Sequence, residues 1–249
     1  MTRKNYTDHI RRHTSENICH AVDYAKWLGV PLNKYVVLNL TYRDDGAVSA
    51  AEIFKKIRHK YRDWLINLRR RNGLTEVPAA YIYSLECPDE MTHANWMLHV
   101  PRGFEEEFLR KLPQWVIRSK GALGPYDISV DEVDPKTDKR LAKYVIKGTD
   151  PTYVKYLHLE DVSAPQGRIY GRRASCSVSI GRAARDAAGF VPKRDRNAWK
   201  KRLEISQPSV STTNVAPFHA MRRGLFPQRR PVDAPPRLIL VESEPAGPN

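Results

Sequence analysis

The sequence predicts an α+β domain in which helices pack against an antiparallel or mixed sheet. Segments with helical periodicity and short runs of β-branched and aromatic residues follow one another as helix, strand, helix, strand, strand, helix, strand, helix. Two of the strands are adjacent in the middle of the chain, which favours an antiparallel pairing over a purely parallel sheet. The length of 249 residues is enough for one well-packed domain with additional segments.

In the first half of the chain, residues 14–28 have the apolar periodicity of a helix and residues 35–42 the composition of a buried strand. Ser49 and Glu52 have the spacing of a capping box ahead of a helix that runs to about residue 71 and ends at Gly73. One sign of charge dominates the outer face of this helix, which makes phosphate contact plausible. Its basic residues are Lys55, Lys56, Arg58, Lys60, Arg62 and Arg69–Arg71.

The second half predicts two strands at 79–86 and 93–100, an amphipathic helix that includes residues 104–112, and a half-buried strand at 126–133. A last helix runs to Lys147, with Pro135 at its first position and Gly148 as a left-handed cap. These elements divide the chain into an N-terminal helical segment (1–31), a main domain (32–190) and a basic, Pro-rich tail (191–249) that we expect to be disordered.

The formal net charge of +14 suits a polyanionic partner, because basic side chains that bind phosphates release condensed counterions. A basic protein with an acidic protein partner, or with none, is the plainer alternative. No apolar run is long enough to span a bilayer, and residues 1–4 lead into polar sequence rather than a signal core. The three cysteines (Cys19, Cys87, Cys176) are widely spaced and form no CxxC. We therefore expect a cytoplasmic protein with no membrane partner.

A candidate metal site lies on the two central strands. If residues 87–92 form the hairpin loop, Glu86 lies opposite His93, and Asn95 shares their face because alternate strand residues point the same way. A carboxylate, an imidazole and an amide make a mixed site suited to Mg²⁺ or Mn²⁺. His99 is roughly 20 Å from His93 along an extended strand, which is too far to share an ion, and we interpret it as structural.

A candidate nucleophile lies on the last helix. Tyr144 and Lys147 are three residues apart and therefore neighbours on the helix surface. A nearby positive charge favours the phenolate, which is the form that attacks phosphorus. Taken alone, such a pair is common, and the usual interpretation is a half-buried ring beside a solvated amine. Tyr153 and Tyr156 are rival nucleophiles.

Together these residues resemble the HUH endonucleases, in particular plasmid and phage rolling-circle replication initiators. The apolar strand 37–41, ending in Thr41, is similar to the family's first motif. His93-Ala-Asn95 is similar to the second motif, in which Asn95 replaces a second histidine. Residues 144–147 match the third motif, Tyr-x-x-Lys. The resemblance covers about residues 32–185, and Asn39 stands where Thr is commoner in the family.

The resemblance implies a five-stranded antiparallel sheet that carries a metal site of Glu86, His93 and Asn95 with Mg²⁺ or Mn²⁺. It implies that Tyr144 attacks single-stranded DNA at a replication origin, forms a 5′-phosphotyrosine link and frees a 3′ hydroxyl, while Lys147 orients the reacting groups. A host helicase and polymerase would then be partners, since the chain has no Walker-type loop. Backbone contacts are expected from four arginines: Arg172, Arg173, Arg182 and Arg185.

Three alternatives remain open. Asn95 is compatible with a non-catalytic DNA-binding replication regulator on the same fold. A transposase or relaxase would share the chemistry, so the sequence leaves the plasmid, phage or transposon context open. An RNA-binding protein that stacks bases on Tyr81 and Tyr83 is a third possibility. The origin sequence, the metal and the oligomeric state do not follow from the sequence.

Overall fold

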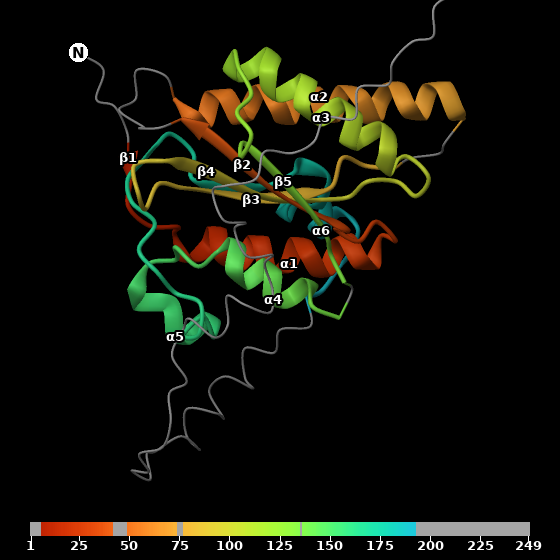
Figure 1. Ribbon diagram of the computed structural model, residues 1–249. Helices are drawn as coiled ribbons and strands as arrows, with labels where there is room; N and C mark the ends of the chain where they lie inside the picture. Colours follow the sequence, from red (N-terminus) through yellow and green to blue (C-terminus); the bar gives the residue numbers. More distant parts are fainter. Residues whose placement is uncertain (1–5, 42–48, 74–76, 135, 193–249) are drawn as a thin grey trace, which may run out of the picture. The chain divides into compact units, whose positions relative to one another are not determined.

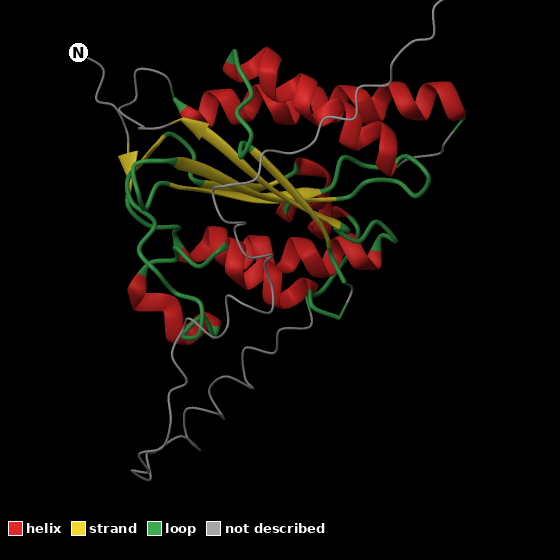
Figure 2. Ribbon diagram, in the orientation of Figure 1, coloured by secondary structure: helices red, strands yellow, loops and turns green. Residues whose placement is uncertain are grey.

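The computed structural model describes residues 6–41, 49–73, 77–134 and 136–192, and these place a five-stranded antiparallel sheet between two layers of helices (Figure 1). Figure 2 shows the same layers by secondary structure. The strands are β1 (Tyr6–Thr7), β2 (Lys34–Thr41), β3 (Tyr81–Glu86), β4 (Thr92–Leu98), β5 (Ile128–Glu132), β6 (Ile169–Tyr170) and β7 (Ala174–Cys176). The helices are α1 (Arg12–Trp27), α2 (Ala50–Asn72), α3 (Glu105–Lys120), α4 (Asp138–Val145), α5 (Val154–Leu157) and α6 (Arg182–Ala187).

The sheet has the strand order β5-β2-β4-β3-β7, and each neighbouring pair is antiparallel. The predicted α+β class and the antiparallel hairpin of β3 and β4 are therefore confirmed. The fifth strand, β7, comes from a segment whose residues alone predicted no strand. It pairs with β3, and its three residues lie at the edge of the sheet. The short β1 and β6 form a separate antiparallel pair.

One face of the sheet packs against α2 and α3 through an aromatic core. Trp96 lies at its centre, with its ring edge-to-face against Phe54 and Tyr61 at centroid distances of 5.5 and 5.3 Å. Tyr81 and Tyr83 belong to the same core: Tyr83 is 1% exposed, and the Tyr81 ring packs against Tyr61 and Trp96. Tyr83 is therefore covered and cannot stack an RNA base, whereas Tyr81 is only half-buried.

The opposite face carries α1 and α4 (Figure 1). The apolar side of α1, including Ile18, Ala21 and Ala25, is fully buried in this layer. The N-terminal helix thus packs as part of the same compact unit as the sheet. Of the tail predicted from residue 191, only Val191 and Pro192 are within the described residues.

The helix caps predicted at Ser49 and Gly148 do not form as expected. Ser49 is the N-cap of α2, but its hydroxyl donates to the Tyr170 carbonyl at 3.4 Å instead of closing a capping box with Glu52. Gly148 is not left-handed: α4 ends at Val145, and a Cβ at Gly148 would lie 2.5 Å from the Gln166 side chain. Glycine is needed there for close packing. The predicted N1 residue, Pro135, lies outside the described residues, and α4 begins after Thr137.

Within the described ranges, no helix has both the length and the apolar character that crossing a bilayer would require.

Candidate functional site

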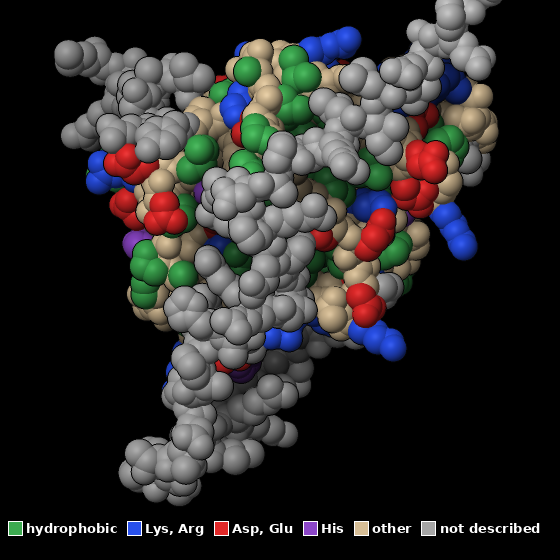
Figure 3. Space-filling model, in the orientation of Figure 1, with side chains coloured by type: hydrophobic (Ala, Val, Ile, Leu, Met, Phe, Trp, Pro, Cys, Tyr) green, Lys and Arg blue, Asp and Glu red, His purple; other side chains and the backbone are tan. Residues whose placement is uncertain are grey.

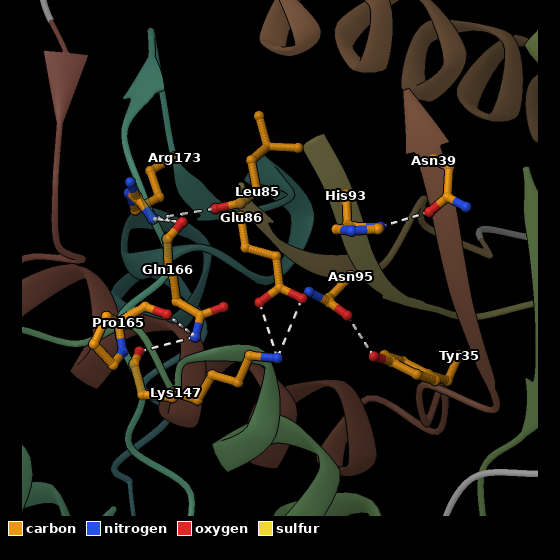
Figure 4. A network of polar contacts seen from close by, with 11 residues as sticks. Tyr35, Asn39, Leu85, Glu86, His93, Asn95, Lys147, Pro165, Gln166 and Arg173 are labelled. Carbon is orange, nitrogen blue, oxygen red and sulfur yellow. Dashed lines mark hydrogen bonds and ion pairs between the residues drawn. The ribbon is translucent and has the colours of Figure 1, made fainter. Parts of the chain in front are cut away.

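The β3–β4 hairpin brings the three predicted ligands together. Glu86 lies directly opposite His93, and Asn95 lies opposite Ser84 two positions further along the same face. These side chains face the layer that contains α4 (Figure 4). Glu86 is 7% exposed and Asn95 is 2% exposed, so both polar groups are largely removed from bulk water. The predicted register of the hairpin is therefore confirmed.

Asn39 on β2 fixes the proton position of His93. The Asn39 amide nitrogen donates to the Tyr126 carbonyl at 2.6 Å, so its oxygen is the atom that lies 2.5 Å from Nδ1 of His93. An amide oxygen can only accept, and Nδ1 of His93 must therefore carry the hydrogen. The lone pair of the neutral imidazole is then on Nε2. In metal sites, a hydrogen bond from the second ring nitrogen orients a histidine ligand in the same way.

Tyr35 on β2 holds the Asn95 amide by a hydrogen bond. Its buried hydroxyl donates to Oδ1 of Asn95 at 2.5 Å. Burial raises the pKa of Tyr35 well above its ordinary value, and the neighbouring Tyr144 and Glu86 raise it further, so Tyr35 remains a neutral phenol and a hydrogen-bond donor. The buried Nδ2 of Asn95 has no hydrogen-bond partner among the described residues and points toward Glu86 in Figure 4.

Lys147 connects the sheet to the predicted nucleophile. Its ammonium lies 2.9 and 3.2 Å from the two carboxylate oxygens of Glu86 and 3.9 Å from the centroid of the Tyr144 ring. Lys147 follows the end of α4 in a turn, where its amide donates to the Tyr144 carbonyl at 3.1 Å. Tyr144 and Lys147 are therefore neighbours, as predicted. The Tyr144 side chain is half-buried, and Lys147 joins it to Glu86, His93 and Asn95, which we call the Glu86 cluster.

The turn that carries Lys147 is held from several sides. The amide of Ile10 donates to the Gly148 carbonyl at 2.8 Å, and the hydroxyls of Ser15 and Thr149 lie 2.7 Å apart in a buried contact. The amide of Ala164 donates to the Lys147 carbonyl at 3.2 Å. Segments from both ends of the domain therefore fix the direction in which the lysine leaves the backbone.

The residues present fit a hard divalent cation. Glu86 offers carboxylate oxygens and His93 offers the Nε2 lone pair, while three protein ligands leave further positions for water or substrate. The unpartnered Nδ2 of Asn95 supports this fit: rotating the amide by half a turn would direct Oδ1 toward Glu86 and let Nδ2 donate to the Tyr35 oxygen. No cluster of three His, Cys, Asp or Glu occurs in the described part of the chain, so this set depends on the amide.

The four arginines predicted to contact DNA divide into two pairs. Arg173 is 3% exposed and donates to the carbonyls of Thr7, Gln166 and Gly167, while Arg185 is 4% exposed and donates to the Ile180 carbonyl at 2.8 Å. Burial lowers the pKa of Arg173 to about 10. These contacts give the two buried guanidinium groups a structural role. Arg172 and Arg182 are exposed and available to a ligand.

The rival tyrosines and His99 have other surroundings. The Arg12 guanidinium lies over the rings of Tyr153 and Tyr156, at 5.6 and 4.7 Å from their centroids. Nδ1 of His99 lies 2.7 Å from the Pro31 carbonyl, and this hydrogen bond agrees with the structural role expected for that histidine.

Sequence reasoning did not find Tyr35, and it noted Asn39 only as a departure from the family pattern. Their four-residue spacing on one strand puts them on the same face, but only the register of β2 against β4 shows that they meet Asn95 and His93. The fold and the site define an α+β protein with a polar cluster on a sheet face beneath a tyrosine-bearing helix. No protein-family model matches the chain, and no curated protein matches it.

Proposed function

We propose that this protein is a metal-dependent, HUH-like endonuclease that nicks single-stranded DNA at a replication origin with Tyr144 as the nucleophile. The observation that carries the proposal is the position of Lys147, which touches both the Glu86 carboxylate and the Tyr144 ring. It means that a phenol, a candidate cation site and a positive charge meet on one sheet face. That combination is what attack on a phosphodiester requires.

In the proposed reaction, the Tyr144 oxygen attacks the scissile phosphorus. A bond forms between that oxygen and phosphorus, and the bond from phosphorus to the 3′ oxygen breaks. The phenol loses its proton to water and the departing 3′ oxygen gains one, which leaves a 5′-phosphotyrosine and a free 3′ hydroxyl. Lys147 neutralises charge beside the ring, and Asn39 keeps His93 in the tautomer that can bind a cation. When bound, Mg²⁺ or Mn²⁺ would supply Lewis-acid stabilisation of the phosphate charge.

The test is covalent trapping. Short single-stranded DNA libraries are incubated with the protein and Mn²⁺ and resolved on denaturing gels. We expect a protein–DNA adduct that disappears in the variant Tyr144→Phe and persists in Tyr153→Phe and Tyr156→Phe. An undiminished adduct in Tyr144→Phe would refute the assignment, and loss in one of the controls instead would identify the true nucleophile.

A second function is favoured by one observation. The Lys147 ammonium already neutralises the Glu86 carboxylate without any metal, and Asn95 is an amide rather than a stronger imidazole ligand. Both features fit a non-catalytic DNA-binding replication regulator. That function predicts salt-sensitive DNA binding and no adduct with either Mg²⁺ or Mn²⁺, so the same gels distinguish it from the nickase.

A further inference from the structure

The described surface also holds a strongly basic cavity, whose lining includes none of Glu86, His93 and Asn95. A cavity of about 720 Å³ opens between the segment that leads into α1, the turn before β7, and α6. Five arginines and two carboxylates line it. On the face shown in Figure 3, by contrast, basic and acidic side chains are interspersed. We call this cavity the α1–α6 groove.

The positive charge of the α1–α6 groove is available to a ligand. Arg11, Arg172 and Arg182 are exposed, whereas the other two arginines form part of its buried framework. Both carboxylates already have basic partners: Glu16 lies 3.1 Å from Arg12, and Asp186 lies 3.5 Å from Arg182. Arg182 is thus partly neutralised, but Arg11 and Arg172 leave the groove with more cations than anions, as a phosphate backbone requires.

An aromatic surface continues from the groove along α1. Phe190 lines the groove, and its ring centroid is 5.7 Å from that of Trp27. Trp27 is 60% exposed and stacks on Tyr24 at 5.5 Å with an interplanar angle of 17°. Tyr24 anchors this stack, because it is buried and its hydroxyl donates to the Ala184 carbonyl. An exposed indole supported from beneath is a platform on which a base can stack.

We infer that the α1–α6 groove and the Trp27 platform form a binding tract for single-stranded DNA. Proteins that bind single strands combine a basic groove for the backbone with aromatic side chains for the bases, and this surface has both. Helix α1 separates His13 in the groove from Trp27 by about 20 Å, which several nucleotides can span. The identification of the polyanion as DNA rests on the proposed function, but the tract needs no chemistry at Tyr144.

The experiment measures the binding of a labelled oligothymidylate to the full chain by fluorescence anisotropy over a series of salt concentrations. The test variants are Arg11→Gln/Arg172→Gln and Trp27→Ala. A charge-matched control is Arg110→Gln/Arg118→Gln on the exposed surface of α3, across the sheet from the groove. All five positions are exposed, so these variants should fold, and circular dichroism verifies this.

We expect the arginine pair to weaken binding and to reduce the log–log salt slope by about 1.4, since each phosphate contact to a single strand contributes about 0.7. Trp27→Ala should weaken binding by about 5-fold or more. The α3 control should bind as the unaltered protein does. Unchanged binding in either groove variant, or an equal loss in the α3 control, would overturn the inference.

Tyr144→Phe separates this inference from the proposed function. If it loses the adduct but binds the oligothymidylate normally, and the groove variants bind weakly, both proposals are supported. If adducts form while the groove variants bind normally, the tract is wrong and the nickase stands. If no adduct forms with any DNA while the groove variants still lose binding, the nickase is wrong and the tract stands.

Discussion

Replacing Lys147 with Met tests whether the ammonium holds the place of a divalent cation. The Lys147 and Glu86 side chains are only 11% and 10% exposed, so the pair is little screened by solvent. Removing one partner of a buried ion pair costs about 3–5 kcal/mol, because it leaves the other charge uncompensated. For a domain of this size, each kcal/mol lowers the melting temperature by roughly 2–4 °C. We therefore expect a clear loss of stability without metal.

The same variant should bind Mn²⁺ more tightly. Two unit charges about 4 Å apart near a protein surface interact with about 4 kcal/mol, and the ammonium opposes a cation at Glu86 by an interaction of this kind. If only a third of that repulsion survives screening and movement of the lysine, its removal improves the affinity about tenfold. Mn²⁺ at 100 times its dissociation constant would then restore about 2.7 kcal/mol of the lost stability.

The assay is thermal unfolding over a Mn²⁺ titration for the unaltered protein, Lys147→Met and Lys143→Met. Lys143 is the matched control, because it lies on α4 one turn before Lys147 but donates to the His158 carbonyl instead of Glu86. Mn²⁺ should raise the melting temperature of Lys147→Met at lower concentrations than it does for the other two proteins. The reasoning fails if all three respond alike, or if Glu86→Gln/Lys147→Met responds as strongly as Lys147→Met.

Three further predictions concern the surroundings of the site. Arg173→Lys should destabilise the fold by about 2 kcal/mol in denaturant titrations, since an ammonium cannot reproduce the fork of hydrogen bonds to backbone carbonyls, whereas Arg172→Lys at the exposed neighbour should be neutral. Burial lowers the pKa of His99, so the unfolded chain takes up its proton first and stability should fall as the pH drops below about 6.5. His99→Gln should flatten that decline between pH 7 and pH 5, and an unchanged profile would refute the assignment. Asn39→Ala should weaken Mn²⁺ binding about 10-fold or more in calorimetric titrations, because His93 could then also adopt the tautomer with its hydrogen on Nε2. Equal affinity would show that the Asn39 amide does not control metal binding.

Local patterns were sufficient to predict the hairpin and the ligand face. The turn residues between Glu86 and His93 set the register, and strand alternation then placed Asn95 on the same side. The i to i+3 spacing similarly placed Lys147 beside Tyr144, even though the helix ends before the lysine. These features depend on residues that are close in sequence, which is why the sequence could predict them.

Contacts between distant segments could not be predicted in this way. Asn39 meets His93 because β2 pairs with β4, and nothing in either strand alone specifies that partner. Gly148 has the signature of a left-handed cap, yet its small size serves the close approach of Gln166 from a later loop. Arg173 looks like a solvent-exposed basic residue in the sequence, but its neighbours in the fold are backbone carbonyls.

The segment before α1 joins the two proposed sites. The backbone of Ile10 bonds to the Gly148 carbonyl and accepts from the Asp150 amide, which fixes the turn that carries Lys147. The residues on either side, His9 and Arg11, line the α1–α6 groove. A DNA strand held in the groove would therefore contact the same short segment that positions the lysine beside Tyr144. We therefore propose that α1 and the segment before it contribute directly to the site.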